Sequence, residues 1–296
     1  MRKKVLILGA GGQLGQALGQ EFRSTHESLE AVHHSPQPGQ LTVELADPRG
    51  TTELLDRTRP DWILIPAAFC NVDLCETERE RCRQVNALGP RTVAEWARAN
   101  GARVVYYSTD HVFDGAAPAY SEEDPVSPLS VYARAKVEGE QAVRELLPEG
   151  HLILRTSGLY GPEAARKNFV VRLVDQLRAG ETVRVPSDQW GSPTYNQDLA
   201  GITRFLLEKG AHGTYHAVGP DFLPRIELAR KVCSAFRLDE RLLEPVETSQ
   251  LRQPARRPLR VRLNTRRLES SGAPPPRPLA AGLETLKKFL SKPAGA

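Results

Sequence analysis

A glycine-rich turn follows directly after the first apolar run of this chain. The run Val5–Leu8 is short and continuous, and the turn Gly-Ala-Gly-Gly-Gln-Leu-Gly spans residues Gly9–Gly15. Such a run is typical of a strand buried on both faces of a parallel sheet. Apolar side chains on one helical face from Leu14 to Phe22 predict a helix immediately afterwards. The turn is therefore expected to join a strand to a helix.

Strand-like and helix-like segments alternate as far as about residue 155. Further strands are expected at Leu29–Val32, Gln40–Leu45, Trp62–Ile65, Arg103–Tyr107 and Leu152–Leu154. Helices are expected from Pro48, capped by Asp47, to about Arg59, from about Glu78 to Asn100, and from Val131 to Leu147. This alternation predicts an α/β fold with a doubly wound parallel Rossmann sheet and right-handed crossovers.

The pattern is looser after Arg155. Expected elements are helices at Phe169–Leu177 and Asp198–Leu207, a strand at Thr214–Ala217 that could be the last of the sheet, and a final helix at Leu279–Leu290. A stiff proline-rich connector, Ala273–Pro278, precedes that helix. We expect a main domain of residues 1–157 and about 183–218, with a smaller C-terminal substrate lobe of about 158–182 and 219–296.

Composition excludes several classes of protein. The chain has 296 residues, of which 40% are apolar and 26% charged, as in ordinary soluble domains. Its net charge is only +4, but arginines crowd one stretch, at positions 252, 256, 257, 260, 262, 266 and 267. Such a stretch could bind nucleic acid or a phosphorylated small molecule. Because it lacks the interleaved aromatic residues of single-strand binders, we expect no nucleic-acid partner.

No membrane or metal site is expected. No apolar run approaches the roughly 20 residues that cross a bilayer. The basic start Met1–Val5 leads into a strand rather than a signal peptide, so a cytoplasmic location is expected. The cysteines at 70, 75, 82 and 233 match no zinc spacing, which favours unpaired thiols in or near the core.

The glycine turn has the spacing of a dinucleotide site. Gly9 permits a tight turn, Gly12 lets backbone N–H groups approach a pyrophosphate, and Gly15 lets the helix pack close to the strand. Gln13 and Leu14 begin the helix, whose dipole favours phosphate there. The alternative is a glycine-rich turn that binds nothing. Because Gly9–Gly15 lies between the first expected strand and the first expected helix, the dinucleotide site is favoured.

The choice of dinucleotide depends on the end of the second expected strand. NAD sites usually have Asp or Glu there, to hold the ribose hydroxyls. This chain has His33, His34 and Ser35 instead. With no acid to repel a 2′-phosphate, the sequence favours NADPH, with NADH tolerated.

Two further pairs of residues are expected beside the cofactor. Glu44 and Leu45 end the third expected strand and could flank the adenine. Ala67 and Ala68 follow the fourth strand and are small enough for the backbone to pass close to the cofactor, although simple packing is the alternative.

A tyrosine and a lysine four residues apart suggest a proton donor. Tyr132 and Lys136 lie on one face of the expected helix 131–147. A nearby ammonium, together with the positive nicotinamide ring of an oxidised cofactor, should lower the phenol pKa from its usual value near 10. The phenol could then protonate a carbonyl oxygen while hydride arrives at carbon. Thr109, at a strand end, could bond the same oxygen. An ordinary surface Tyr and Lys is the alternative, which the other motifs disfavour.

These motifs together resemble the extended short-chain dehydrogenase/reductase superfamily, and within it the dTDP-4-dehydrorhamnose reductases. The similar segments are Gly9–Gly15, Ala67–Phe69, Val72–Asp73 with Glu76, Val85–Ala87, Tyr107–Gly115, Tyr132 with Lys136, Leu154–Ser157, Asp188–Thr194, Gly213–His216 and Arg257–Pro258. They cover nearly the whole chain. The blocks Ser-Thr-Asp…Val-Phe-Asp-Gly and Gln-x-Gly-x-Pro-Thr are much more specific than the glycine turn.

The resemblance implies reduction of the C4 ketone of a dTDP-linked 6-deoxy-4-keto sugar, with dTDP-4-dehydro-L-rhamnose giving dTDP-L-rhamnose. Thr109 would then orient the keto oxygen, Tyr132 would donate the proton, and Lys136 would tune Tyr132 and hold the cofactor ribose. The residues implied to bind substrate are Asp110, Gln189, Trp190, Pro193, Thr194 and Arg257, the last through its fit to a diphosphate.

One position departs from the family pattern. Family members commonly have a tryptophan after Arg-Thr-Ser, to pack against the sugar, and this chain has Gly158. Trp190 could replace that wall, or the substrate could be another 4-keto-6-deoxy sugar. Some members need magnesium at a dimer contact; a homodimer stays open, and the sequence shows no carboxylate cluster that predicts the metal.

Two rival functions remain at this stage. One is a different sugar-nucleotide ketoreductase or epimerase with the same hydride chemistry. The other is a binding protein like the regulatory β subunit of methionine adenosyltransferase, which shares this fold and binds a dinucleotide. The presence of Thr109, Tyr132 and Lys136 together argues for catalysis.

Overall fold

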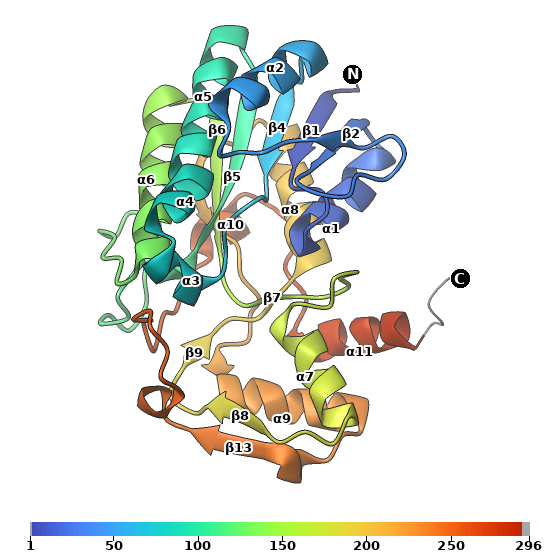
Figure 1. Ribbon diagram of the computed structural model, residues 1–296, viewed down its shortest axis with the longest axis vertical. Coiled ribbons are helices and arrows are strands. Elements are labelled where there is room, and N and C mark those ends of the chain that lie inside the picture. Colours follow the sequence, from blue (N-terminus) through green and yellow to red (C-terminus); the bar gives the residue numbers. More distant parts are fainter. Residues whose placement is uncertain (1, 292–296) are drawn as a thin grey trace.

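A seven-stranded sheet forms the larger part of the molecule (Figure 1). The computed structural model describes residues 2–291. Its strands are β1 (Lys4–Leu8), β2 (Glu27–Val32), β3 (Leu41–Thr42), β4 (Trp62–Ile65), β5 (Arg103–Thr109), β6 (His151–Thr156) and β11 (Gly213–His216). The order is β11-β6-β5-β4-β1-β2-β3, and every neighbouring pair is parallel. The strand order reverses beside β1, which confirms the doubly wound α/β fold.

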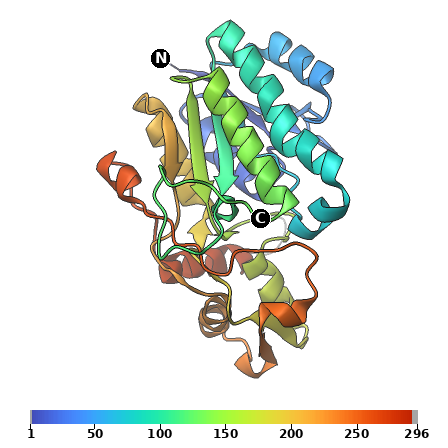
Figure 2. The same ribbon diagram turned by 90° about the vertical axis from the view of Figure 1, so that its left-hand side faces the viewer.

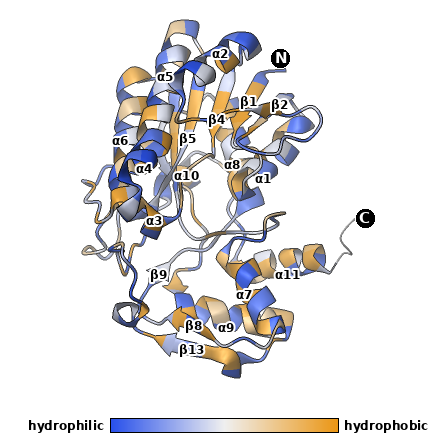
Figure 3. Ribbon diagram, viewed as in Figure 1, coloured by the Kyte–Doolittle hydropathy of each residue, from blue (hydrophilic) through white to orange (hydrophobic). Residues whose placement is uncertain are grey.

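Helices cover both faces of this sheet. Helices α1 (Gln13–Arg23) and α8 (Asn196–Glu208) pack on one face, while α2 (Pro48–Thr58), α5 (Gly89–Asn100) and α6 (Val131–Leu146) pack on the other. Figure 2 shows α5 and α6 side by side. Figure 3 shows apolar residues gathered on the strands between these layers. Since both faces are covered, the strands are the continuous apolar runs that their sequence shows.

Helix ends follow the local signals in the sequence. The Asp47 side chain accepts a hydrogen bond from the Arg49 N–H at the start of α2, and Ser130 accepts one from the Ala133 N–H at the start of α6. Gly101 ends α5 in the left-handed conformation, at φ 70°.

The segment expected as one helix from about Glu78 to Asn100 is interrupted. It begins with α4 (Arg79–Arg83), passes through a π-helical turn at Gln84–Leu88 and continues as α5; the short helix α3 (Val72–Thr77) precedes it. Within the π turn, the Asn86 carbonyl accepts a hydrogen bond from the Tyr106 hydroxyl at 2.6 Å. The Asn86 side chain bonds both backbone groups of Phe69 at 3.0 Å. These bonds attach the turn to the loop that follows β4.

A smaller lobe lies below the sheet in Figure 1 and has its own apolar core. Its elements are α7 (Phe169–Arg178), β8 (Val183–Pro186), α9 (Arg225–Phe236), β13 (Leu243–Val246) and α11 (Leu279–Leu290). Connecting elements are β7 (Leu159–Tyr160), β9 (Trp190–Gly191), β10 (Thr194–Tyr195), β12 (Leu223–Pro224), α10 (Arg266–Ser270) and 3₁₀ turns at Asp110–Val112, Glu240–Leu242 and Thr248–Leu251.

The segment from residue 183, expected in the main domain, begins with a strand that packs in the lobe. Strand β8 pairs in parallel with β13, and Val185 is fully buried in the lobe core. Conversely, α10 lies in the tail assigned to the lobe, yet its Leu268 is buried against the main sheet. No helix among residues 2–291 combines the length and apolar character needed to cross a membrane.

Candidate active site

The glycine turn fits closely between β1, α1 and the end of β4. A Cβ atom at Gly9 would lie 2.7 Å from the Ala67 nitrogen, and one at Gly15 would lie 2.1 Å from the Gly9 oxygen. Helix α1 starts after Gly12 without a side-chain cap, and the Gln13 Nε2 atom is buried without a hydrogen-bond partner. Uncapped N–H groups at the start of an 11-residue helix fit the pyrophosphate of a dinucleotide.

The small residues after β4 lie beside this turn. The Ala67 N–H donates to the Leu8 oxygen at 3.0 Å, which fixes Ala67 at the end of β1, with Ala68 next in the chain. Leu14 is buried on α1 in the sheet core. Leu45 is likewise buried, under the start of α5, where a Cβ at Gly89 would lie 2.6 Å from the Leu45 oxygen. Leu14 and Leu45 thus lie in the two apolar cores of the main sheet, one in each.

The end of β2 is not free of acid, contrary to the sequence argument for NADPH. The Glu44 carboxylate contacts the Nε2 atom of His33, and both side chains are about half exposed. The second Glu44 oxygen accepts the Ala46 N–H at 3.1 Å. The acid comes from the segment after β3, which is why a search at the end of β2 alone does not find it.

Thr109, Tyr132 and Lys136 converge at the carboxyl edge of the sheet. Thr109 ends β5, and the other two residues lie in the first turns of α6. The Tyr132 ring lies edge-on to the His111 ring, with the two ring centroids 6.2 Å apart. The Thr109 hydroxyl donates to the Asp110 carboxylate at 3.2 Å. The phenol and the alcohol thus flank the 3₁₀ turn Asp110–Val112 at the strand end, where both can reach one substrate oxygen.

The pKa of Tyr132 is shifted in the direction opposite to the expected one. Burial raises it, and the nearby Asp110 carboxylate adds to this. Burial also lowers the pKa of Lys136 to about 7, so its ammonium is not permanently charged. The Lys136 Nζ lies 3.8 Å from the ring centroid of Tyr106. A raised pKa keeps the Tyr132 phenol protonated, as a proton donor requires.

The lowered pKa of the buried Lys136 leads to a prediction of how the free energy of unfolding depends on pH. Its pKa is about 7 in the folded chain against an ordinary value of 10.5. Between these values the unfolded chain binds more protons, so the free energy of unfolding due to Lys136 rises with pH. Urea unfolding of wild type and Lys136→Met across this range should show that only the wild type has the rise. If the unfolding free energies of the two proteins changed with pH in parallel, the lowered pKa of Lys136 would be contradicted.

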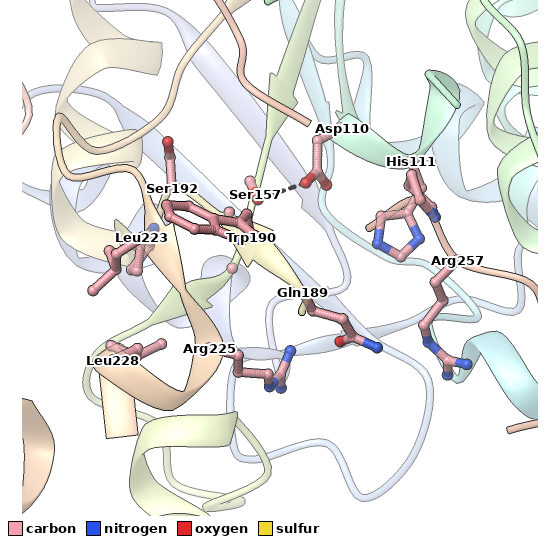
Figure 4. A pocket seen from close by; sticks show the side chains of 14 residues that line it. Asp110, His111, Ser157, Gln189, Trp190, Ser192, Leu223, Arg225, Leu228 and Arg257 are labelled. Carbon is pink, nitrogen blue, oxygen red and sulfur yellow. Dashed lines mark hydrogen bonds between the residues drawn. The ribbon is translucent and has the colours of Figure 1, made fainter. Parts of the chain in front are cut away.

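A cavity of about 110 Å³ opens beside this edge (Figure 4). Of the residues implied to bind substrate, Asp110, Gln189, Trp190, Pro193 and Arg257 line it, together with His111, Ser157, Gly158 and Arg225. The Asp110 carboxylate accepts a hydrogen bond from the Ser157 hydroxyl at 2.7 Å. Thr194 does not reach the cavity, because it is fully buried and bonds the Ser192 oxygen and the Gly219 N–H.

Arg225 is a cavity residue that the sequence argument missed. Burial, with the nearby charges of Arg172 and Arg257, lowers its pKa to about 10. Its guanidinium lies 4.1 Å from the Phe169 ring centroid, and no carboxylate among residues 2–291 pairs with it. Arg257 differs, because Asp73 holds it at 2.7 Å. In Figure 4, Gln189 stands between the two arginines. A partly buried cation at a cavity wall, with no carboxylate beside it, favours an anionic ligand.

Trp190 and Gly158 line the same cavity. Gly158 has a φ of 54°, and a Cβ there would lie 3.4 Å from the Pro193 Cα. The Arg260 guanidinium lies 4.5 Å from the Trp190 ring centroid. The aromatic side of the cavity is therefore formed by Trp190. Over the described part of the chain, no group of three or more His, Cys, Asp and Glu side chains is placed to hold a metal.

Residues 2–291 match the model of the RmlD substrate binding domain family. The chain belongs to this family. It is 32% identical to dTDP-4-dehydrorhamnose reductase of Salmonella typhimurium, over 90% of each chain. It is also 32% identical to methionine adenosyltransferase 2 subunit beta of Mus musculus, over 97% of this chain and 88% of that protein.

Solved structures of the RmlD family have the same fold. The dTDP-4-dehydrorhamnose reductase of Bacillus anthracis, in complex with NADP, superposes with a TM-score of 0.89 at 31% identity, over 99% of this chain and 100% of that one. Relatives of both kinds, reductase and adenosyltransferase subunit, thus align over most of this chain.

Proposed function

We propose that this chain reduces the C4 ketone of a dTDP-linked 4-keto-6-deoxy sugar, with dTDP-4-dehydro-L-rhamnose as substrate and NADPH as the preferred reductant. The observation that supports this most is the placement of Tyr132 against His111 and of Thr109 against Asp110, because His111 and Asp110 both line the cavity. The reductase of Salmonella typhimurium and the NADP complex of the Bacillus anthracis protein support the substrate class and the cofactor.

The side chains divide the chemistry of ketone reduction. A reduced nicotinamide supplies the hydride when it is bound on the glycine turn. Tyr132 donates its phenol proton to the substrate oxygen, which becomes the alcohol, and Thr109 holds that oxygen in place. Lys136 holds the ribose hydroxyls and, when protonated, stabilises the phenolate that Tyr132 leaves behind. Each turnover thus adds one hydride and one proton to the carbonyl group.

The nucleotide sugar is held by the charged side of the cavity. Arg225 and Arg257 bind the diphosphate, because guanidinium groups match phosphate oxygens with two parallel hydrogen bonds. Asp110 accepts a sugar hydroxyl on the side of Thr109. Trp190 packs against the sugar in place of the tryptophan that position 158 lacks.

Replacing Arg225 by Met should raise the KM for the nucleotide sugar by about 10- to 100-fold, the usual worth of a hydrogen bond to a charged group. The kcat should change little, because the diphosphate does not react. Initial rates over a range of substrate concentrations measure both constants. Arg230→Met on the same helix is the matched control, since Arg230 is half exposed and pairs with Glu227. An unchanged KM in Arg225→Met would remove Arg225 from the substrate site.

The proposed reaction is tested directly by incubating the chain with dTDP-4-dehydro-L-rhamnose and NADPH. Oxidation of NADPH is followed by absorbance, and the product is identified by mass spectrometry and NMR. Formation of dTDP-L-rhamnose supports the proposal. Faster turnover of another 4-keto-6-deoxy sugar would support the proposed ketone reduction but would identify that sugar as the substrate.

A second function is a regulatory subunit that binds a dinucleotide. It is favoured by the match to the mouse methionine adenosyltransferase subunit, which covers 97% of this chain. Under this alternative, NADPH binds but is not oxidised with any keto sugar. Binding without turnover across a panel of nucleotide-linked keto sugars would therefore select it.

A further inference from the structure

Lys136 is buried without an acidic partner. It is 1% exposed, and no carboxylate oxygen among residues 2–291 lies within 4 Å of its Nζ atom. Glu140, one turn further along α6, is paired with Arg155 and Arg144 instead. A buried ammonium loses its hydration, which favours the neutral amine. Another group must therefore offset this loss if Lys136 is to act as a cation.

The aromatic ring of Tyr106 faces this ammonium. The Lys136 Nζ atom lies 3.8 Å from the centre of the ring, and Tyr106 is fully buried. A cation over an aromatic face is attracted by the negative charge of the π system, and the attraction is stronger in a site without water. Tyr106 lies on β5, three residues before Thr109, so the ring belongs to the strand that ends at the active site.

The position of the Tyr106 ring is fixed from two sides. Its hydroxyl donates to the Asn86 carbonyl of the π-helical turn at 2.6 Å. On α6, a Cβ atom at Gly139 would lie 2.5 Å from the same hydroxyl oxygen, so a glycine at this place lets the helix approach the ring. Gly139 is three residues beyond Lys136 and shares its helix face. The same close contact of helix and strand thus brings the ammonium onto the ring.

No other group near Lys136 takes over this role. Its titratable neighbours are Glu140 and Tyr132 on its own helix and the thiols of Cys70 and Cys82. Phenols and thiols are ordinarily uncharged at neutral pH. Of these groups only Glu140 is ordinarily an anion, and its carboxylate is held by the two arginines. The π face of the ring is therefore the direct contact that favours the charged form of Lys136.

We propose that Tyr106 is a positioning residue of the active site: its ring face binds the Lys136 ammonium and keeps it charged on the helix face that carries Tyr132. This inference rests on the proposed function, in which Tyr132 gives up its proton in each turnover. A ring without π charge would leave Lys136 in place but would favour its neutral amine. Tyr132 would then lose the cation that stabilises its phenolate, and kcat would fall at a lower pH.

The test replaces Tyr106 by phenylalanine and then by phenylalanines with one, two and three ring fluorines, which weaken the π face stepwise and change the ring shape little. Tyr106→Phe keeps the ring, so the midpoint of the alkaline fall in kcat should stay close to the wild-type value. Across the fluorine series the midpoint should move by about 0.5 to 1 pH unit to lower pH, as expected for a buried cation–π contact. Steady-state rates with the nucleotide sugar and NADPH measure it.

The same series at Tyr107 is the matched control. Tyr107 is the next residue of β5, but its side chain packs in the apolar core on the other face of the sheet. Fluorines there should leave the midpoint unchanged. A merely structural role for Tyr106 would lower the free energy of unfolding of Tyr106→Phe, through the lost bond to Asn86, and would leave the midpoint fixed along the Tyr106 series. That result would overturn the inference.

A second readout does not need the reaction. The free energy of unfolding should begin to rise with pH at a lower pH as fluorines are added at position 106, because the pKa of folded Lys136 falls. Urea unfolding over a range of pH measures this onset. If the chain reduces no keto sugar, the proposed function fails, and the onset alone decides the inference. If the onset does not move, Tyr106 does not hold the charge of Lys136.

Discussion

Tyr132→Phe should lower kcat by about 100- to 10,000-fold, the usual contribution of a positioned proton donor. The change removes one oxygen, and it leaves the ring against the cluster of buried thiols at Cys75 and Cys82. Burial raises the pKa of the hydroxyl, so it holds a proton at neutral pH. Without it, the alkoxide formed at C4 must take a proton from water. Steady-state kinetics with the nucleotide sugar and NADPH measures the loss.

The dissociation constant of NADPH should stay within about twofold of the wild-type value, because Tyr132 acts on the substrate oxygen. Tyr107→Phe is the matched control. It also removes a buried phenol oxygen from the main domain, but Tyr107 donates to Thr203 under α8, in the core on the other face of the sheet. Its kcat should be close to wild type. A fall of less than tenfold in Tyr132→Phe would show that another group donates the proton.

Local patterns in the sequence predict most of the main sheet. Short apolar runs mark the buried strands, and a glycine turn, a helix cap or a proline marks many of their boundaries, so β4 and the final helix α11 have the expected bounds. The parallel sheet follows from the alternation alone. The convergence of Thr109 with Tyr132 follows as well, because carboxyl ends of parallel strands share one edge.

Features that depend on distant pairing could not be read from the sequence. Val183–Pro186 pairs with Leu243–Val246, and nothing local in either segment specifies the other. Glu44 likewise reaches His33 because β3 pairs with β2, which is also a contact between separate segments. No motif surrounds Arg225 in the sequence; what marks it is its place in the cavity wall with no carboxylate partner among residues 2–291. The raised pKa of Tyr132 has a related reason, since its first cause is burial by segments that no local pattern around Tyr132 specifies.

A buried ion pair connects α6, which carries Tyr132 and Lys136, to the sheet. The Arg155 guanidinium on β6 donates to both carboxylate oxygens of Glu140 on α6, at 2.9 and 2.7 Å, and both side chains are 2% exposed. Arg155 also lies 5.1 Å from the ring centroid of Phe113. Glu140 is four residues beyond Lys136, and its charge raises the pKa of that lysine. The pair therefore fixes α6 and affects the charge at the active site.

Glu140→Gln should lower the free energy of unfolding by about 3–5 kcal/mol, because it leaves Arg155 charged and buried without a carboxylate. Urea denaturation followed by circular dichroism measures the change. Glu138→Gln on the same helix is the matched control; its partner Arg83 is exposed, so stability should stay close to wild type. The double variant Arg155→Met with Glu140→Leu should recover most of the loss, because it removes both charges together. If Glu140→Gln is as stable as the control, water must reach Arg155, and the pair does not hold α6 on the sheet.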